Sequence, residues 1–284
     1  MTPFRPPGRM PRPLVLPWLA ATLLTGGGAA ATAPDWDILG IRLGMSEAEV
    51  RAALQTYDAQ ARITARHASF QYSDQVRSHT TPPFLSQLEM RTSQKVGQNV
   101  LPQTFVRVWF SGVQAGEARA IAVMRDESNV PNPPSGPQFL QSLAGKYGQP
   151  STTDRQHTPI WEQRGKPSCL WMSYGRNLPK EINHTLFSLN LVHRMDFGDA
   201  VAALQRRQQG SGGEHGVDLP ADLRQCGAFM YYLGTARSPA ISFNAAMFDV
   251  GAIVATQRSR QAWVQQLEAE AVRKREGQAQ SPRL

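Results

Sequence analysis

The sequence predicts an α+β fold built from antiparallel meander sheets with capping helices, and a long C-terminal helix at its end. Three observations support this prediction. Two segments carry strong helix-start signals, each is followed by short strand-like segments separated by turns, and no long alternation of strands and helices of the parallel type occurs. Such an order favours an antiparallel α+β architecture over a parallel α/β one.

The first helix is predicted to start at Ser46. Its hydroxyl can accept the backbone N–H of Glu49 while the Glu49 carboxylate accepts the Ser46 N–H, which is the capping-box arrangement. Met45 and Val50 occupy the two positions whose apolar contact fixes how the chain enters a helix. An apolar stripe at helical spacing continues from Val50, so we expect this helix to pack on a sheet. A ligand-binding loop at Gly44 is the alternative.

Four strands are predicted after this helix, from alternating apolar residues or from β-branched and aromatic residues. They span 61–66, 84–91, 104–110 and 118–125. The last two are expected to pair as a hairpin. Residues 73–83 are predicted to be a loop, because they are polar and end in two prolines.

A second capping box, formed by Ser135 and Gln138, predicts a second helix that ends at Gly148 and Pro150. The strand-like segments that follow span 160–161, 169–174, 185–192, 226–232 and 241–250, with a short helix over 199–208. A long last helix is expected from Asp249 or Val250 to Arg275. Its final basic residues suit the negative end of the helix dipole.

This repeat of a capped helix and a strand meander predicts two tandem modules, residues 34–134 and residues 135–251. Residues 252–284 are expected to form the C-terminal helix and tail. The two halves share a pattern of elements and have few identical residues.

Residues 1–33 have the layout of a secretory signal peptide, with three arginines, no acid, an apolar run and small residues before a cleavage site. Cleavage after Ala31 or after Ala33 fits this layout. A retained membrane anchor is the alternative, although Pro17 interrupts the run and the apolar part is shorter than the roughly 20 residues that span a bilayer. Cleavage predicts a periplasmic or secreted protein without a stable membrane span.

The charge of the chain argues against nucleic acid as a partner. The whole sequence carries a formal net charge of +8, and without the three arginines of residues 1–33 the remainder carries +5. The arginines are spread through every predicted element instead of forming one basic stripe.

Cys169 and Cys226 are the only cysteines, and in an exported chain they are expected to form a disulfide. Free buried thiols are the alternative. Two thiols without a CxxC spacing do not predict a zinc site.

The sequence holds no recognised catalytic motif, and no metal or cofactor site is predicted. It lacks HExxH, GxSxG, GxxxxGK[ST] and GxGxxG. His193, Asp196 and Asp199 come closest to a ligand cluster, but a loop followed by an aspartate N-cap explains them more simply. The other histidines are dispersed, at positions 67, 79, 157, 184 and 215.

Two short motifs carry a resemblance. Gly44-Met45-Ser46 with Val50, and Tyr147-Gly148-Gln149-Pro150, are similar to the helix start and helix end of the small outer-membrane-assembly lipoproteins of the SmpA/OmlA (BamE-like) type and of the tandem-repeat β-lactamase inhibitor proteins. As a whole, the chain resembles exported proteobacterial proteins of no assigned activity. The resemblance implies a periplasmic α+β binding or scaffold module, although no cysteine precedes Cys169 to accept a lipid.

The sequence therefore favours a non-catalytic, exported binding or scaffold module whose partner is another cell-envelope protein. The alternative is a secreted hydrolase or small-ligand carrier with a site assembled from dispersed residues, such as His184 or His193 with nearby acids.

Overall fold

The computed structural model confirms the predicted α+β class. It describes residues 34–113, 116–153, 158–169, 197–209, 219–234 and 239–278. The predicted signal segment, residues 1–33, and the predicted strand at 185–192 lie outside these residues.

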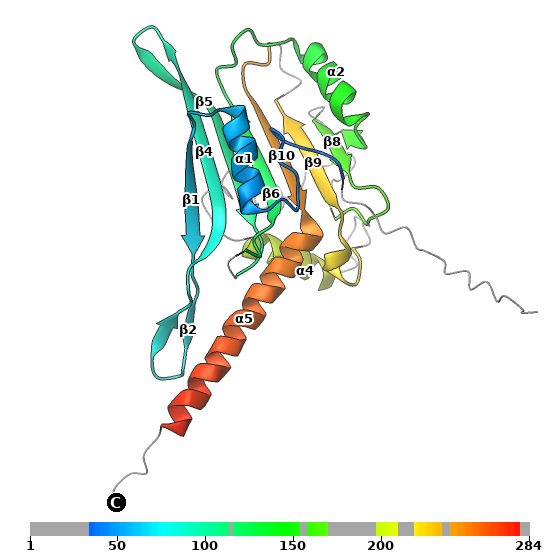
Figure 1. Cartoon of the computed structure of the whole chain (residues 1–284). Coiled ribbons are helices and arrows are strands. Elements are labelled where there is room, and N and C mark those ends of the chain that lie inside the picture. The colour runs from blue at the N-terminus through cyan, green and yellow to red at the C-terminus, as the bar shows by residue number, and fades with distance from the viewer. Residues whose placement is uncertain are drawn as a thin grey trace, which may run out of the picture. The chain divides into compact units, whose positions relative to one another are not determined.

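The described strands form one antiparallel sheet of eight and a separate two-stranded hairpin. The large sheet has the order β1-β4-β5-β6-β10-β9-β8-β7 (Figure 1). Its members are β1 (Arg62–Ala68), β4 (Phe84–Val96), β5 (Asn99–Phe110), β6 (Ala120–Glu127), β7 (Thr152–Thr153), β8 (Pro159–Glu162), β9 (Ala228–Leu233) and β10 (Phe243–Asp249).

Each predicted half contributes four neighbouring strands to the sheet. The strand numbers rise through the first half, from β1 to β6, and fall through the second, from β10 to β7. The two halves meet where β6 pairs with β10, and Val123 lies opposite Met247 there. Both side chains are fully buried. The two predicted meanders therefore share one continuous sheet.

The first layer over the sheet consists of α1 (Glu47–Tyr57) and α2 (Gly136–Tyr147). Both capping boxes are present as predicted, with the hydroxyls of Ser46 and Ser135 accepting from the backbone N–H three residues later. The predicted end of α2 is also confirmed, since Gly148 adopts a φ of 77°. Apolar side chains of both helices join one core cluster with the sheet.

The opposite face of the sheet is covered in its second half by α4 (Gly198–Gln209), the short 3-10 helix η2 (Leu223–Gln225) and the first turns of α5 (Val250–Gly277). The predicted helices over 199–208 and from Asp249 are confirmed, with the Asp249 carboxylate accepting from Ala252 N as the N-cap of α5. Cys169 and Cys226 form the predicted disulfide within this cluster, with Cα atoms 5.5 Å apart.

One local prediction is wrong. The segment expected to be a loop, 73–83, contains part of a hairpin of β2 (Gln71–Ser73) and β3 (Ser78–Thr80). Of the strand expected over 169–174, only Cys169 is described, and it belongs to no strand; residues 170–174 lie outside the described part. The hairpin and the last turns of α5 extend together beyond one end of the large sheet (Figure 1).

Candidate functional site: the cleft between the hairpin and the last helix

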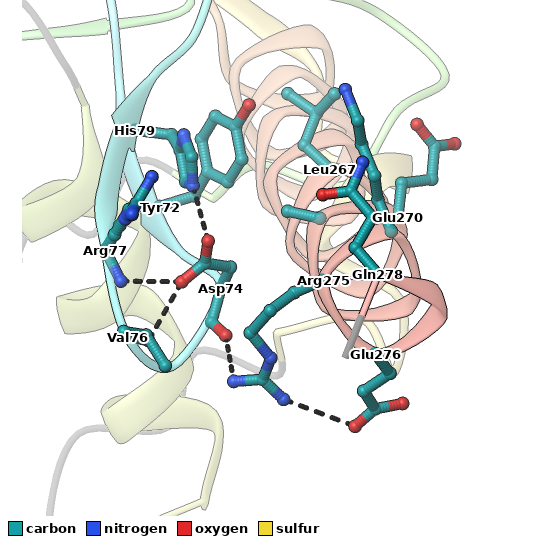
Figure 2. Close-up of a pocket in the computed structure, with 12 residues that line it drawn as sticks. Tyr72, Asp74, Val76, Arg77, His79, Leu267, Glu270, Arg275, Glu276 and Gln278 are labelled. Carbon is teal, nitrogen blue, oxygen red and sulfur yellow. Dashed lines mark hydrogen bonds and ion pairs between the residues drawn. The ribbon is translucent and has the colours of Figure 1, made fainter. Parts of the chain in front are cut away.

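An open cleft of about 890 Å³ lies between the β2–β3 hairpin and the C-terminal turns of α5 (Figure 2). The hairpin lines it with Tyr72, Asp74, Val76, Arg77 and His79, and the helix side with Leu267, Glu270, Ala271, Lys274, Arg275, Glu276 and Gln278. Segments about 200 residues apart in the sequence thus form its two walls.

Asp74 fixes the turn of the hairpin. One carboxylate oxygen, Oδ1, accepts hydrogen bonds from the backbone N–H of Val76 at 2.8 Å and of Arg77 at 2.6 Å. Such an aspartate turn lets a tight reversal form without glycine, and here Gln75 takes the left-handed conformation with a φ of 75°. The other oxygen, Oδ2, lies 2.9 Å from His79 Nε2.

These hydrogen bonds stabilise the charged form of the carboxyl group. The bond with His79 contributes most, followed by the N–H groups of Arg77 and Val76, and together they hold the pKa of Asp74 well below its ordinary value of 3.8. The turn is therefore built around an ionised aspartate across the physiological pH range.

The helix side is joined to the hairpin by Arg275. Its Nη1 donates to the Asp74 carbonyl oxygen at 2.5 Å and its Nη2 donates to Gln75 Oε1 at 3.2 Å. Near the base of the hairpin, Trp263 of α5 packs edge-on against Phe84, with ring centroids 6.1 Å apart. The two hydrogen bonds of Arg275 and the Trp263–Phe84 contact thus position the two walls.

His79 and Asp74, which both line the cleft, form a hydrogen-bonded histidine–carboxylate pair. The imidazole ring of His79 stacks on Tyr72, with centroids 5.3 Å apart. Among the described residues, no hydroxyl or thiol is hydrogen-bonded to this ring. The pair stabilises the turn of the hairpin, because one oxygen of Asp74 lies 2.9 Å from His79 Nε2 while the other accepts from the backbone of Val76 and Arg77.

Two basic side chains in the cleft remain available. The charges of Asp74, Arg275 and Glu276 are engaged within the walls (Figure 2). Arg77 and Lys274 are exposed, and they form none of the ion pairs among the described residues. Glu270 is exposed as well, and its carboxylate accepts a hydrogen bond from the amide of Gln266. The cleft therefore presents two basic side chains and one acidic side chain outside its ion pairs.

The histidines and acids singled out from the sequence are not brought together by the described structure. His184, His193 and Asp196 lie outside the described residues, while Asp199 lies in α4 with a side chain that is not described. His79 was not singled out, although the short polar–aromatic segments on either side of Asp74-Gln75 could have predicted a hairpin.

Neither a metal centre nor a membrane helix is found in the described part of the chain. No group of three or more His, Cys, Asp or Glu side chains there is placed to hold a metal ion. None of the described helices combines the length and the apolar character needed to cross a membrane.

Comparison with protein-family models, with curated proteins and with solved structures finds no match to this chain. The resemblance to the SmpA/OmlA-type and β-lactamase-inhibitor domains therefore stays a prediction.

Proposed function

We propose that the protein is a non-catalytic binding module of the cell envelope, which holds a segment of another envelope protein in the cleft between the hairpin and α5, with acidic side chains of that segment meeting Arg77 and Lys274. The observation that carries this proposal is the cleft itself. It is open, Arg275 braces one wall against the other, and Arg77 and Lys274 are exposed basic side chains that form none of the ion pairs among the described residues.

Two further features support the proposal. The Cys169–Cys226 disulfide suits an oxidising compartment outside the cytoplasm. Val76, at the tip of the hairpin, is 73% exposed, and such an apolar side chain beside basic groups is a suitable anchor for a peptide partner. Residues 1–33 supply the export signal that this location requires.

Site-specific photo-crosslinking in intact cells tests the proposal. A photoreactive residue is placed at Val76 or at Lys274, and a matched one at Gln55, an exposed position of α1 outside the cleft. We expect one recurrent envelope protein to be captured from the two cleft positions and not from Gln55. The same preparations should have the mass of a chain that lacks its first 31 or 33 residues.

A double charge reversal, Arg77→Glu with Lys274→Glu, provides the specificity control. It should reduce capture from Val76 by roughly tenfold or more, because like charges at a contact are strongly unfavourable. Equal capture from Val76 and Gln55, or capture that the charge reversal does not change, would refute the proposal.

A further inference from the structure

A second site lies on the large sheet, on the face opposite α1. In β5 the side chains of Val106 and Val108 join the core under α1, so Phe105 and Arg107 point to the other face. Trp109, next in this alternation, joins the core under α4 and α5. The second half of this face is thus apolar and covered, whereas the first half is charged.

The strand register brings four charged residues together on that charged half. Glu89 of β4 lies opposite Arg107 of β5, and Arg91 follows on β4 two residues later. Arg66 of β1 reaches the same carboxylate, with Nη2 2.8 Å from Glu89 Oε2. Arg107 Nε is 3.4 Å from Oε1, and Arg91 Nη2 is 4.0 Å from Oε2.

Phe105 holds two of these guanidinium groups in place. The Cζ atom of Arg91 is 4.3 Å from the ring centroid, and that of Arg107 is 4.2 Å from it. Cation–π contacts at this range are attractive. Together with the shared Glu89 carboxylate, they keep two like charges close together.

The floor of this cluster is short of hydrogen-bond acceptors. Arg107 is only 3% exposed, and neither its Nε nor its Nη1 has a hydrogen-bond partner. Buried guanidinium N–H groups without a hydrogen-bond acceptor are costly, since they have lost their bonds to water, and the ion pair with Glu89 offsets only part of that cost. Desolvation, opposed by Glu89 and Asp126 and reinforced by Arg91 and Arg66, lowers the pKa of Arg107 to about 10, so the group stays charged at neutral pH.

The charges of the cluster do not cancel. Three guanidinium groups surround the Glu89 carboxylate. The other acid on this face, Asp126, accepts from Asn244 and also acts on the charge of Arg107, so one positive charge is in excess with both acids counted. Arg66 and Arg91 have side-chain exposures of 45% and 66%, so they form the solvent-facing part of the cluster, while Arg107 lies buried beneath them.

We propose that Arg66, Arg91 and Arg107 form a binding site for an oxyanion of the phosphate class, either free or as the headgroup of a lipid. Such an anion would offset the excess positive charge, and Arg107 Nε and Nη1, which lack hydrogen-bond partners, would be the donors for its oxygens. Guanidinium groups suit it because their planar forks bind phosphate oxygens two at a time. The site is separate from the cleft and does not depend on its proposed partner.

Calorimetric titration of the full exported chain with inorganic phosphate tests the site, with chloride at equal ionic strength as the blank. Arg91→Gln is the main variant because Arg91 is exposed, so its loss leaves the fold intact. Arg273→Gln, an exposed arginine of α5, makes the same charge change elsewhere. We expect Arg91→Gln to weaken binding about tenfold, the size of one lost charge-assisted hydrogen bond, and Arg273→Gln to leave it unchanged.

Vesicles that contain phosphatidic acid form the second arm and identify the source of the phosphate group. Binding to these vesicles but not to inorganic phosphate, lost in Arg91→Gln, would support a lipid headgroup as the ligand. Binding of neither probe, or equal binding by Arg91→Gln and Arg273→Gln, would overturn the site. Arg77→Glu in the cleft should leave phosphate binding unchanged, which separates this result from the proposed partner site.

Discussion

At the scale of single residues, the start of α5 requires glycine at position 251. Gly251 lies in the first turn of this helix, where an added Cβ would lie 2.5 Å from the Arg224 carbonyl oxygen and 2.8 Å from that of Cys226. Backbone atoms cannot move aside cheaply. We expect Gly251→Ala to lower the free energy of unfolding by about 2 to 3 kcal/mol, through the strain of overpacking, as measured by urea denaturation.

Gly145 is the matched control, because it lies within α2 and an added Cβ would meet no atom within 4 Å. Gly145→Ala should raise the free energy of unfolding by roughly 0.5 to 1 kcal/mol, since alanine loses less conformational entropy in a helix. Equal effects of the two substitutions would contradict the close packing of α5 against η2.

Residue-scale predictions from the sequence succeeded where the signal was local. Ser46 and Ser135 cap their helices with partners three residues away, and Gly148 ends α2 through its own backbone conformation. Arg107 and Glu89 gave no such signal. Only the register between β4 and β5 places them side by side, and a register joins residues far apart in the sequence.

At the scale of elements, the β2–β3 hairpin should respond to acid through Asp74. The folded-state pKa of this carboxyl is lowered, so its contribution to stability is fully present above the unfolded value near 3.8 and is lost as the pH falls below it. We expect the amide NMR signals of Val76 and Arg77 to shift toward unfolded positions over that acidic range.

Asp74→Asn isolates this effect, because an amide does not ionise and pairs more weakly with His79. The variant should show the altered amide positions already at neutral pH. Asp35→Asn, at an exposed acid paired with Arg42, should leave both amides unchanged. A wild-type acid transition retained in Asp74→Asn would show that another group controls the hairpin.

The elements also show what sequence patterns leave out. Alternation and turn residues predicted β1, β6, β9 and β10 at nearly their observed positions. The β2–β3 hairpin was missed because each strand has three residues, too few to show a period. The cleft was missed with it, since its second wall is the end of α5 and the contact between them is tertiary.

At the scale of the whole molecule, the disulfide links the segment that follows β8 to the segment that leads into β9. Cys169 and Cys226 are 57 residues apart. Closing a loop of that length stabilises the folded state by about 4 kcal/mol in the chain-entropy account. Reduction should lower the free energy of unfolding by that order, whereas a Cys169→Ala, Cys226→Ala variant should be insensitive to reductant. A wild-type protein that reductant leaves unchanged would contradict this role.

The β6–β10 seam makes a prediction about cooperativity. Six residue pairs run along it, from Phe243 opposite Glu127 to Phe248 opposite Ala122. Above it, two residues of α2 reach Asp37 of the first half: Tyr147 donates to the Asp37 carbonyl oxygen at 2.6 Å, and Lys146 Nζ lies 2.9 Å from Asp37 Oδ1. Contacts of this density across the boundary between 134 and 135 should make both halves unfold in one transition.

Hydrogen-exchange mass spectrometry along a urea series measures this directly, because peptides from β4 and β5 report on the first half and peptides from β8 and β9 on the second. Their midpoints should coincide. Met247→Ala removes a fully buried side chain at the seam and should lower the free energy of unfolding by about 2 to 4 kcal/mol. Both midpoints should then fall together. Two separate midpoints would instead show that the tandem modules are independent units that merely share a sheet.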